Sequence, residues 1–201
     1  TIVTYFYLAS KSPRRKELLT RWGYRFETLL SDQPDSVDEN VLEHESADHY
    51  VQRIASEKSV WGFKELSRLG LPVHPVLAAD TTVVMDGIIY GKPENTQQAY
   101  DFLSAFSGKT HEVLTAVAIA VSHDMKLEAL SRSYVTFRPL TKAEILAYIA
   151  TGEPMDKAGA YGIQGKAGAF VEKICGSYSS IMGLPQMETV QLLQAAGFPY
   201  F

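Results

Sequence analysis

Apolar and polar residues recur along the chain in two different periods, which predicts a fold that mixes strands with helices. β-branched and aromatic residues fill 2–8, and a nearly continuous apolar run over 76–85 is typical of a strand buried on both faces. Asp86-Gly87 predicts a tight hairpin turn after this run, with a return strand over 88–90. The remaining expected strands cover 24–30, 110–121, 127–138 and 169–174, and the two long ones fit a second hairpin.

Helices are expected where a capping residue precedes an apolar stripe of helical spacing. Ser12 is a natural N-cap with Pro13 at the first helical position, and Gly23 follows the end of this helix. Ser46 caps a second helix that runs to about residue 63. Three further helices are expected: one ends near Phe106, one runs from the capping box of Thr141 and Glu144 to Ala150 before Gly152, and one starts near Pro185.

No repeat, low-complexity tract or linker divides these elements. We therefore predict a single α/β domain over residues 1–201, built on a mixed β-sheet flanked by helices, with two lobes and a central cleft. A composition of 46% hydrophobic and 21% charged residues is that of an ordinary soluble globular protein.

The net charge limits the classes of possible binding partner, and the cysteine content indicates the redox compartment. The formal net charge of −4 leaves no general basic field for a nucleic-acid duplex. Cys175 is the single cysteine, which excludes an internal disulfide, fits a reducing compartment and is expected to be partly buried. No apolar stretch approaches the ~20 residues that span a bilayer, and no signal peptide is found before the first strand. We expect a cytoplasmic protein with no membrane partner.

The segment 8–15, Leu-Ala-Ser-Lys-Ser-Pro-Arg-Arg, has the features of a phosphate-binding helix start. Free N–H groups at the first turn of a helix attract anions, and Arg14 and Arg15 add charge and paired donors that suit phosphate oxygens. A surface helix start with solvated arginines is the alternative interpretation.

Two acidic residues are candidates for chemistry. Asp80 interrupts the buried strand over 76–85, where an ionised carboxylate is costly unless it is paired or bound to metal. General base for a water and ligand of a divalent cation are both open roles for it, and an aspartate bonded to local backbone is the structural alternative. Glu39 is a second candidate, with a solvated loop residue as its alternative.

Lys58, Lys92 and Gln164 are candidate contacts to an anionic ligand. Lys58 follows Val51 by two helical turns on the same face, so it either has an acidic or phosphate partner or extends to the surface. Lys92 follows a hairpin strand and precedes a proline, which constrains its backbone. The default interpretation is nevertheless an ordinary surface lysine. Gln164 lies in the glycine-dense run 156–165, which either lets backbone approach a ligand or forms a mobile loop.

Several common motifs are excluded. Gly108-Lys109-Thr110 imitates the end of a Walker A loop, but Leu103 stands where the first glycine is required, and the tripeptide follows a helix. The histidines do not form a zinc pattern, and the sequence has neither the glycine motif of dinucleotide-binding folds nor the nucleophile elbow of serine hydrolases.

An ordered set of short motifs across nearly the whole chain resembles the Maf family of nucleoside triphosphate pyrophosphatases. The matching segments are Leu8–Arg15, Val37-Asp38-Glu39, Arg53–Lys58, Ala79-Asp80-Thr81, Gly91-Lys92-Pro93, Leu103–Gly108, Gly152–Gly165 and Met182–Pro185. Lys11 departs from the small residue usual in the family, and the acidic loop before Glu39 is longer than typical.

The resemblance implies an elongated α/β fold like that of inosine triphosphate pyrophosphatases, usually as a homodimer. It implies hydrolysis between the α and β phosphates to the monophosphate and pyrophosphate with Mg²⁺ or Mn²⁺. Carried over by position, five residues would hold the triphosphate: Ser10, Arg14, Arg15, Lys58 and Lys92. Glu39 and Asp80 would hold the metal or activate water, with Asp80 as proton acceptor.

Substrate choice in the family is associated with three positions, here Arg14, Thr81 and Gln164. This combination is similar to the branch that acts on dTTP and UTP. Modified pyrimidine nucleotides are further expected substrates. The branch that prefers 7-methylguanosine triphosphate is the alternative, and Arg14 and Gln164 argue against it. A non-catalytic nucleotide-binding regulator of cell division would keep the basic residues without needing the carboxylates. Nucleic-acid binding is disfavoured by the net acidity.

Overall fold

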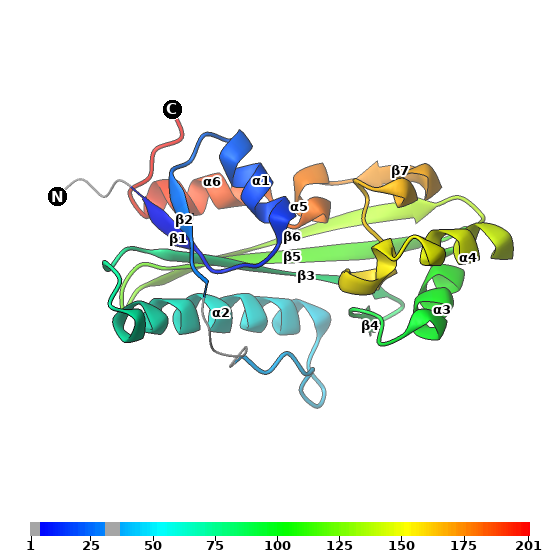
Figure 1. The fold of residues 1–201 in the computed structure, drawn as a ribbon, viewed down its shortest axis with the longest axis horizontal. Helices are drawn as coiled ribbons and strands as arrows, with labels where there is room; N and C mark the ends of the chain where they lie inside the picture. Colours follow the sequence, from blue (N-terminus) through cyan, green and yellow to red (C-terminus); the bar gives the residue numbers. More distant parts are fainter. Residues whose placement is uncertain (1–4, 31–36) are drawn as a thin grey trace. The chain divides into compact units, whose positions relative to one another are not determined.

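A computed structural model describes residues 5–30 and 37–201 of the chain. Residues 1–4, where the predicted first strand begins, and residues 31–36, part of the acidic connector, lie outside the described residues. The elements in chain order are β1 (Phe6–Leu8), α1 (Pro13–Arg21), β2 (Phe26–Thr28), α2 (Ala47–Leu69), β3 (Val76–Met85), β4 (Ile88–Tyr90), α3 (Thr96–Phe106), β5 (Thr110–Ala120), β6 (Lys126–Phe137), α4 (Lys142–Ala150), the 3₁₀ segments η1 (Glu153–Asp156), η2 (Ala158–Ala160) and η3 (Lys166–Phe170), β7 (Val171–Cys175), α5 (Tyr178–Met182) and α6 (Gln186–Ala195) (Figure 1).

The strands form a seven-stranded sheet in the order β2-β1-β3-β5-β6-β7, with β4 paired to β3. β1 runs parallel to both β2 and β3, whereas β3–β4 and β6–β7 are antiparallel pairs. The predicted α/β class with a mixed sheet is therefore confirmed.

The chain divides into two compact units. Unit 1 contains residues 1–80, 115–131 and 183–201, and unit 2 contains residues 81–114 and 132–182. The chain passes from one unit to the other inside three strands, β3, β5 and β6. The single domain over 1–201 and the central cleft stay predictions.

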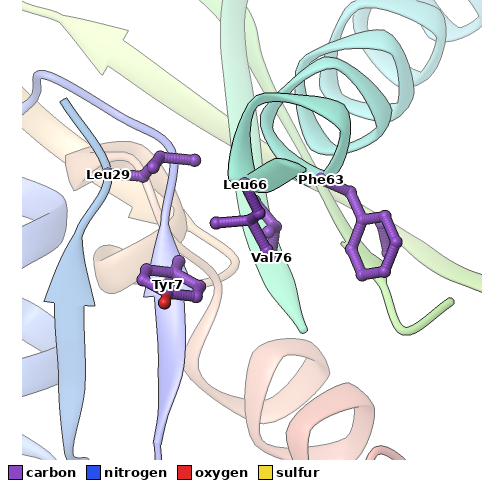
Figure 2. Close-up of a cluster of buried hydrophobic side chains, with 6 residues drawn as sticks. Tyr7, Leu29, Phe63, Leu66 and Val76 are labelled. Carbon is purple, nitrogen blue, oxygen red and sulfur yellow. The ribbon is translucent and has the colours of Figure 1, made fainter. Parts of the chain in front are cut away.

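The core of unit 1 includes Tyr7 and Val76 from the sheet and Phe63 and Leu66 from α2 (Figure 2). A Cβ on Gly62 would lie 2.8 Å from the Val76 side chain, so this glycine lets α2 approach the sheet closely. Phe6, which precedes Tyr7 and therefore faces the other side of β1, packs edge-on against Phe198 near the chain's end. Unit 1 is thus layered on both faces of β1.

Aromatic side chains dominate the core of unit 2. The ring of Phe106 lies 4.8 Å from that of Tyr90 and 4.5 Å from that of His111. Phe137 packs edge-on against Tyr161 at 4.8 Å, an arrangement that aromatic quadrupoles favour. Tyr161 belongs to the glycine-dense run, so this run contributes a side chain to the core.

Local sequence signals located most elements correctly. Ser12 and Ser46 cap α1 and α2 as predicted, and Thr141 forms its capping box with Glu144. β3 and β4 have the predicted bounds, and their turn residues Asp86 and Gly87 have φ of 52° and 76°, as the tight hairpin turn requires.

Some expectations were wrong. α2 continues past residue 63 to Leu69, because Leu66 and Leu69 extend its apolar face, and Gly70 in the left-handed region ends it. The short α5 and the three 3₁₀ segments were not predicted, since they are too short to carry a helical period. Cys175 is exposed and not partly buried, because it ends a strand whose residues are mostly on the surface. In the described residues, no helix combines the length and the apolar character of a membrane span.

Candidate functional site

Ser10 and Arg15 are joined at the start of α1. The Ser10 hydroxyl oxygen accepts from the Ser12 backbone N–H at 3.2 Å and from Arg15 Nη1 at 3.2 Å. Arg15 Nε donates to the Gly183 carbonyl at 2.7 Å, which ties the helix start to a segment 168 residues later. Arg15 is therefore held in place by protein contacts before any ligand arrives.

Arg14 is the less constrained member of the pair. Within the part of the chain that the structure describes, its half-buried guanidinium makes no hydrogen bond or ion pair. Burial lowers the pKa of Arg15, the charge of Arg14 lowers it further, and the carboxylates of Asp80 and Glu39 act in the opposite direction. These four charged groups are thus close enough to affect one another.

Lys58 joins the two candidate carboxylates. Its Nζ lies 2.7 Å from Glu39 Oε1 and 3.2 Å from Asp80 Oδ1. Of the alternatives left open for Lys58, the structure shows the acidic partner. The hydrogen bond of Asp80 to Lys58 accounts for a carboxylate in a strand that is otherwise buried, since a partner offsets the cost of taking the charge out of water.

The surroundings of Asp80 raise the pKa of its carboxyl group. Its side chain is only 13% exposed, and burial raises its pKa, while the positive charges of Lys58 and Arg15 oppose that shift. A carboxylate with a raised pKa binds a proton more readily than an exposed aspartate, which suits a general base.

Glu39 and Asp80 also fit a divalent cation. Both contact the same ammonium nitrogen, so two carboxylates converge on one position. Mg²⁺ prefers oxygen ligands and commonly uses one or two carboxylates together with substrate phosphates and water. Across residues 5–30 and 37–201, no group of three or more His, Cys, Asp or Glu side chains is placed to hold a metal. Glu39 and Asp80 alone could supply at most two protein side chains to a cation.

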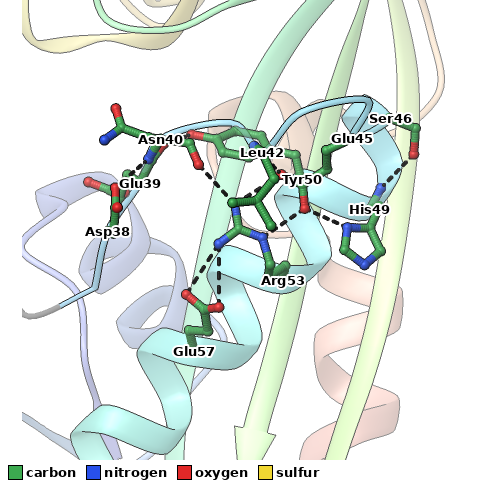
Figure 3. A network of polar contacts seen from close by, with 10 residues as sticks. All are labelled: Asp38, Glu39, Asn40, Leu42, Glu45, Ser46, His49, Tyr50, Arg53 and Glu57. Atoms are coloured by element: carbon green, nitrogen blue, oxygen red, sulfur yellow. Dashed lines mark hydrogen bonds and ion pairs between the residues drawn. The ribbon is translucent and has the colours of Figure 1, made fainter.

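The loop that carries Glu39 is fixed to α2 by contacts that the sequence did not reveal. Tyr50 donates its hydroxyl hydrogen to the Glu39 carbonyl at 2.7 Å, and Arg53 binds Glu45 through Nε at 2.7 Å (Figure 3). The signal that was available is the spacing of Tyr50, Arg53 and Glu57, which places three polar groups on one helix face.

Unit 2 carries three further candidates: Thr81, Lys92 and Gln164. Thr81 is half-buried and directly follows Asp80 in β3. The Gly159 N–H donates to the Gly91 carbonyl at 3.1 Å, so the glycine-dense run lies beside the segment of Lys92. The side chains of Lys92 and Gln164 are exposed, and neither bonds to any described residue.

The backbone around Gln164 is held on both sides. The Gly162 N–H donates to the Tyr148 hydroxyl at 3.2 Å, and the Lys166 N–H donates to Glu153 Oε1 at 3.3 Å. A Cβ on Gly165 would lie 2.0 Å from the same Glu153 oxygen, so a larger residue there would displace the Glu153 side chain from this contact. These contacts favour a fixed turn over the mobile loop that was the alternative.

The side chains of His111 and Tyr161 form a buried pair, and Tyr161 belongs to the same glycine-dense run. His111 Nε2 is 2.6 Å from the Tyr161 hydroxyl, and both side chains are buried. Burial lowers the pKa of His111 to about 4, so the ring is neutral at neutral pH. Sequence analysis gave neither residue a role.

A sequence model of the Maf family, described as Maf-like protein, matches residues 5–196. The chain belongs to this family.

Full-length relatives are named dTTP/UTP pyrophosphatase. The one from Cupriavidus metallidurans is 50% identical and the match covers 99% of this chain and 100% of the relative. The one from Chromobacterium violaceum is 50% identical over 97% and 96% of the two chains, and that from Nitrosomonas europaea is 50% identical over 97% and 96%.

Among solved structures, the Ham1 protein of Staphylococcus aureus aligns over 95% of this chain and 96% of its own, with 13% identity and a TM-score of 0.49. A HAM1 protein from Coxiella burnetii aligns over 67% of this chain and 73% of its own, with 14% identity and a TM-score of 0.46.

Proposed function

We propose that the chain is a nucleoside triphosphate pyrophosphatase that hydrolyses dTTP, UTP and modified pyrimidine nucleotides. Cleavage falls between the α and β phosphates and releases the monophosphate and pyrophosphate. The names of relatives that are 50% identical over nearly the whole chain support the substrate and the reaction. The observation that carries the chemistry is the contact of Lys58 with both Glu39 and Asp80 beside the arginines of α1.

The cationic residues bind the triphosphate in this proposal. Arg14 has no partner among the described residues, so its guanidinium is available for a phosphate. Arg15, the next residue in the chain, is held by its hydrogen bond to the Ser10 hydroxyl. Lys58 and Lys92 add ammonium charge, and catalysis of phosphoryl transfer depends mainly on such positioning and charge stabilisation.

Asp80 takes the proton in the hydrolytic step. The water oxygen bonds to a phosphorus of the α–β linkage, a water proton passes to the Asp80 carboxylate, and the bond from that phosphorus to the bridging oxygen breaks, which separates the monophosphate from pyrophosphate. Its raised pKa supports this role.

A divalent cation, Mg²⁺ or Mn²⁺, would be held by Glu39 and Asp80. When bound it would neutralise charge that develops on the phosphates. Asp80 as base and Asp80 as metal ligand remain two roles of one carboxylate within this proposal.

Base selection is assigned to Arg14, Thr81 and Gln164. The exposed amide of Gln164 can donate to a pyrimidine carbonyl and accept from N3–H, which a carboxylate at this position cannot do together. A cytoplasmic location and a homodimer belong to the same proposal and rest on the family resemblance.

Product analysis tests this proposal. The purified chain is incubated with dTTP, UTP, CTP, GTP and 7-methylguanosine triphosphate, each with Mg²⁺ or Mn²⁺, and the products are identified by phosphorus NMR. We expect dTMP and UMP with pyrophosphate from the first two substrates. Orthophosphate as the first product would refute the cleavage point, and preference for 7-methylguanosine triphosphate would refute the substrate. Nucleotide binding without hydrolysis would favour the regulatory alternative.

A further inference from the structure

The segment from Asp38 to Glu45, which carries Glu39, has no apolar packing of its own to hold it. It forms no helix or strand, and nearly all of its residues are exposed, including Val41 at 46% and Leu42 at 54%. Burial of apolar side chains therefore contributes little to its position, and its contacts with α2 are mainly polar.

One guanidinium binds both ends of this segment. Arg53 donates from Nε to Glu45 Oε2 at 2.7 Å and from Nη2 to Glu45 Oε1 at 2.9 Å (Figure 3). The same Nη2 donates to the Asn40 carbonyl at 2.9 Å, and Nη1 contacts Glu57 at 3.3 Å. The Glu45 side chain is 2% exposed and that of Arg53 is 16% exposed, so this pair is largely shielded from water.

The backbone of Glu39 has its own anchor. Tyr50 donates its hydroxyl hydrogen to the Glu39 carbonyl at 2.7 Å. Glu45 also accepts the Leu42 N–H at 3.1 Å, which closes the segment on itself. Hydrogen bonds from α2 thus hold the segment at three points, the Glu39 carbonyl, the Asn40 carbonyl and the Glu45 side chain.

The anchors and the target of Glu39 lie on the same helix. Tyr50 and Arg53 precede Lys58 on α2 by eight and five residues, and the Glu39 carboxylate reaches Lys58 Nζ at 2.7 Å. A rigid helix therefore sets the distance between the points that hold the segment and the ammonium that Glu39 must meet.

We infer that Arg53 and Tyr50 are positioning residues, which hold the Glu39 carboxylate at Lys58 and Asp80 by pinning the segment 38–45 to α2. This inference rests on the proposed function for its effect on catalysis. Lysine cannot replace Arg53, since an ammonium lacks the planar fork that binds Glu45 and the Asn40 carbonyl together. Residues that orient a metal or substrate ligand from behind commonly account for a factor of about 10 to 100 in activity.

The test compares Arg53→Lys with Arg68→Lys as a matched control. Arg68 is also on α2 and also pairs with a glutamate, Glu65, at 2.8 Å, and it lies fifteen residues beyond Arg53, about 22 Å along the helix. Arg53→Lys is expected to lower kcat for dTTP by roughly 10-fold or more, and Arg68→Lys to change it less than about twofold. Tyr50→Phe removes a single hydrogen bond, so we expect a smaller loss, roughly fivefold.

A double-mutant cycle separates positioning from general damage. If Arg53 acts through Glu39, then Arg53→Lys causes no further loss of kcat once Glu39→Gln is present. An equal loss in both backgrounds would overturn the inference. Unfolding midpoints of all variants are measured alongside, and Tyr50→Phe decides if Arg53→Lys fails to fold.

Hydrogen exchange tests, without an activity measurement, the structural part of the inference, that Arg53 holds the segment 38–45 in place. Amides of residues 40–45 should exchange faster in Arg53→Lys than in the original chain, while the rest of α2 and the Arg68→Lys variant stay unchanged. Unchanged exchange in this segment would overturn the inference. If the original chain does not hydrolyse dTTP at all, the proposed function fails, and the exchange result still decides the positioning of Glu39.

Discussion

The candidate residues of unit 1 and those of unit 2 differ in how their side chains are satisfied. In unit 1, Glu39, Lys58 and Asp80 bond to one another, and Arg15 bonds to Ser10 and Gly183. In unit 2, hydrogen bonds fix the backbone around Gln164, while the exposed Lys92 and Gln164 side chains have no partner in the described chain. The carboxylates of unit 1 are thus held by cations of the protein itself, whereas Lys92 and Gln164 of unit 2 present donors without a partner in the described chain.

The difference follows from the cost of each kind of group. A carboxylate that is 13% exposed, such as Asp80, destabilises the fold unless a cation is present before the ligand. An exposed amide has no such cost because water satisfies it. We therefore expect changes at Glu39, Lys58 and Asp80 to affect the rate with every substrate, and changes at Gln164 to affect the choice among substrates.

The largest effect is expected from Asp80→Asn. The amide keeps the shape but cannot take a proton, so kcat for dTTP should fall by roughly 100-fold to 10,000-fold. The unfolding midpoint should change little, since the amide removes a partly buried charge. Steady-state release of pyrophosphate measures the effect, with Asp124→Asn at an exposed turn as control. A loss below about tenfold would remove Asp80 from the chemistry.

A stability effect on the order of 3 kcal/mol is expected from protonation of His111 in unit 2. Burial lowers its pKa to about 4, whereas an unfolded histidine titrates near its ordinary value of 6.5. Between these values the unfolded chain binds more protons, so the unfolding free energy falls as the pH falls from about 6.5 to about 4.

His111→Phe should remove that part of the pH dependence. Urea unfolding of the variant and the original chain at several pH values between 4 and 7 measures the difference in slope. His123→Phe, at an exposed position, should keep the original slope. Parallel curves for His111→Phe and the original chain would contradict a neutral buried imidazole.

The smallest effect is expected from Tyr148→Phe. The Gly162 N–H loses its acceptor, which costs about 1 kcal/mol of unfolding free energy. Because the turn that carries Gln164 is then held on one side only, KM for dTTP should rise several-fold with little change in kcat. Tyr178→Phe, which alters an exposed ring, is the control. An unchanged KM would mean that the turn does not depend on this bond.

Much of the fold was predictable because its signals are local. The Ser12 cap, the capping box of Thr141 and the turn at Asp86-Gly87 each depend on residues within one helical turn. Asp80 and Lys58 were also predictable, since a charge in an apolar pattern needs a partner.

The rest of the site depends on contacts that no local pattern encodes. Arg15 bonds to the Gly183 carbonyl, 168 residues away, and Tyr50 bonds to a carbonyl of an irregular segment. Every residue has a backbone carbonyl, so the residue types along the chain do not show which carbonyl a side chain binds. Such partners follow only from the tertiary fold. The same holds for the His111–Tyr161 pair, whose members are 50 residues apart.

The division of roles between the two units is tested most directly by the ratio of kcat/KM for UTP to that for CTP, two substrates that differ only at the pyrimidine edge. In Lys58→Gln we predict that both values fall by the same factor, so the ratio stays within about twofold of the original. In Gln164→Glu we predict that the ratio falls about tenfold, because the donor to the uracil carbonyl is lost. A changed ratio in Lys58→Gln, or equal losses for both substrates in Gln164→Glu, would contradict the account.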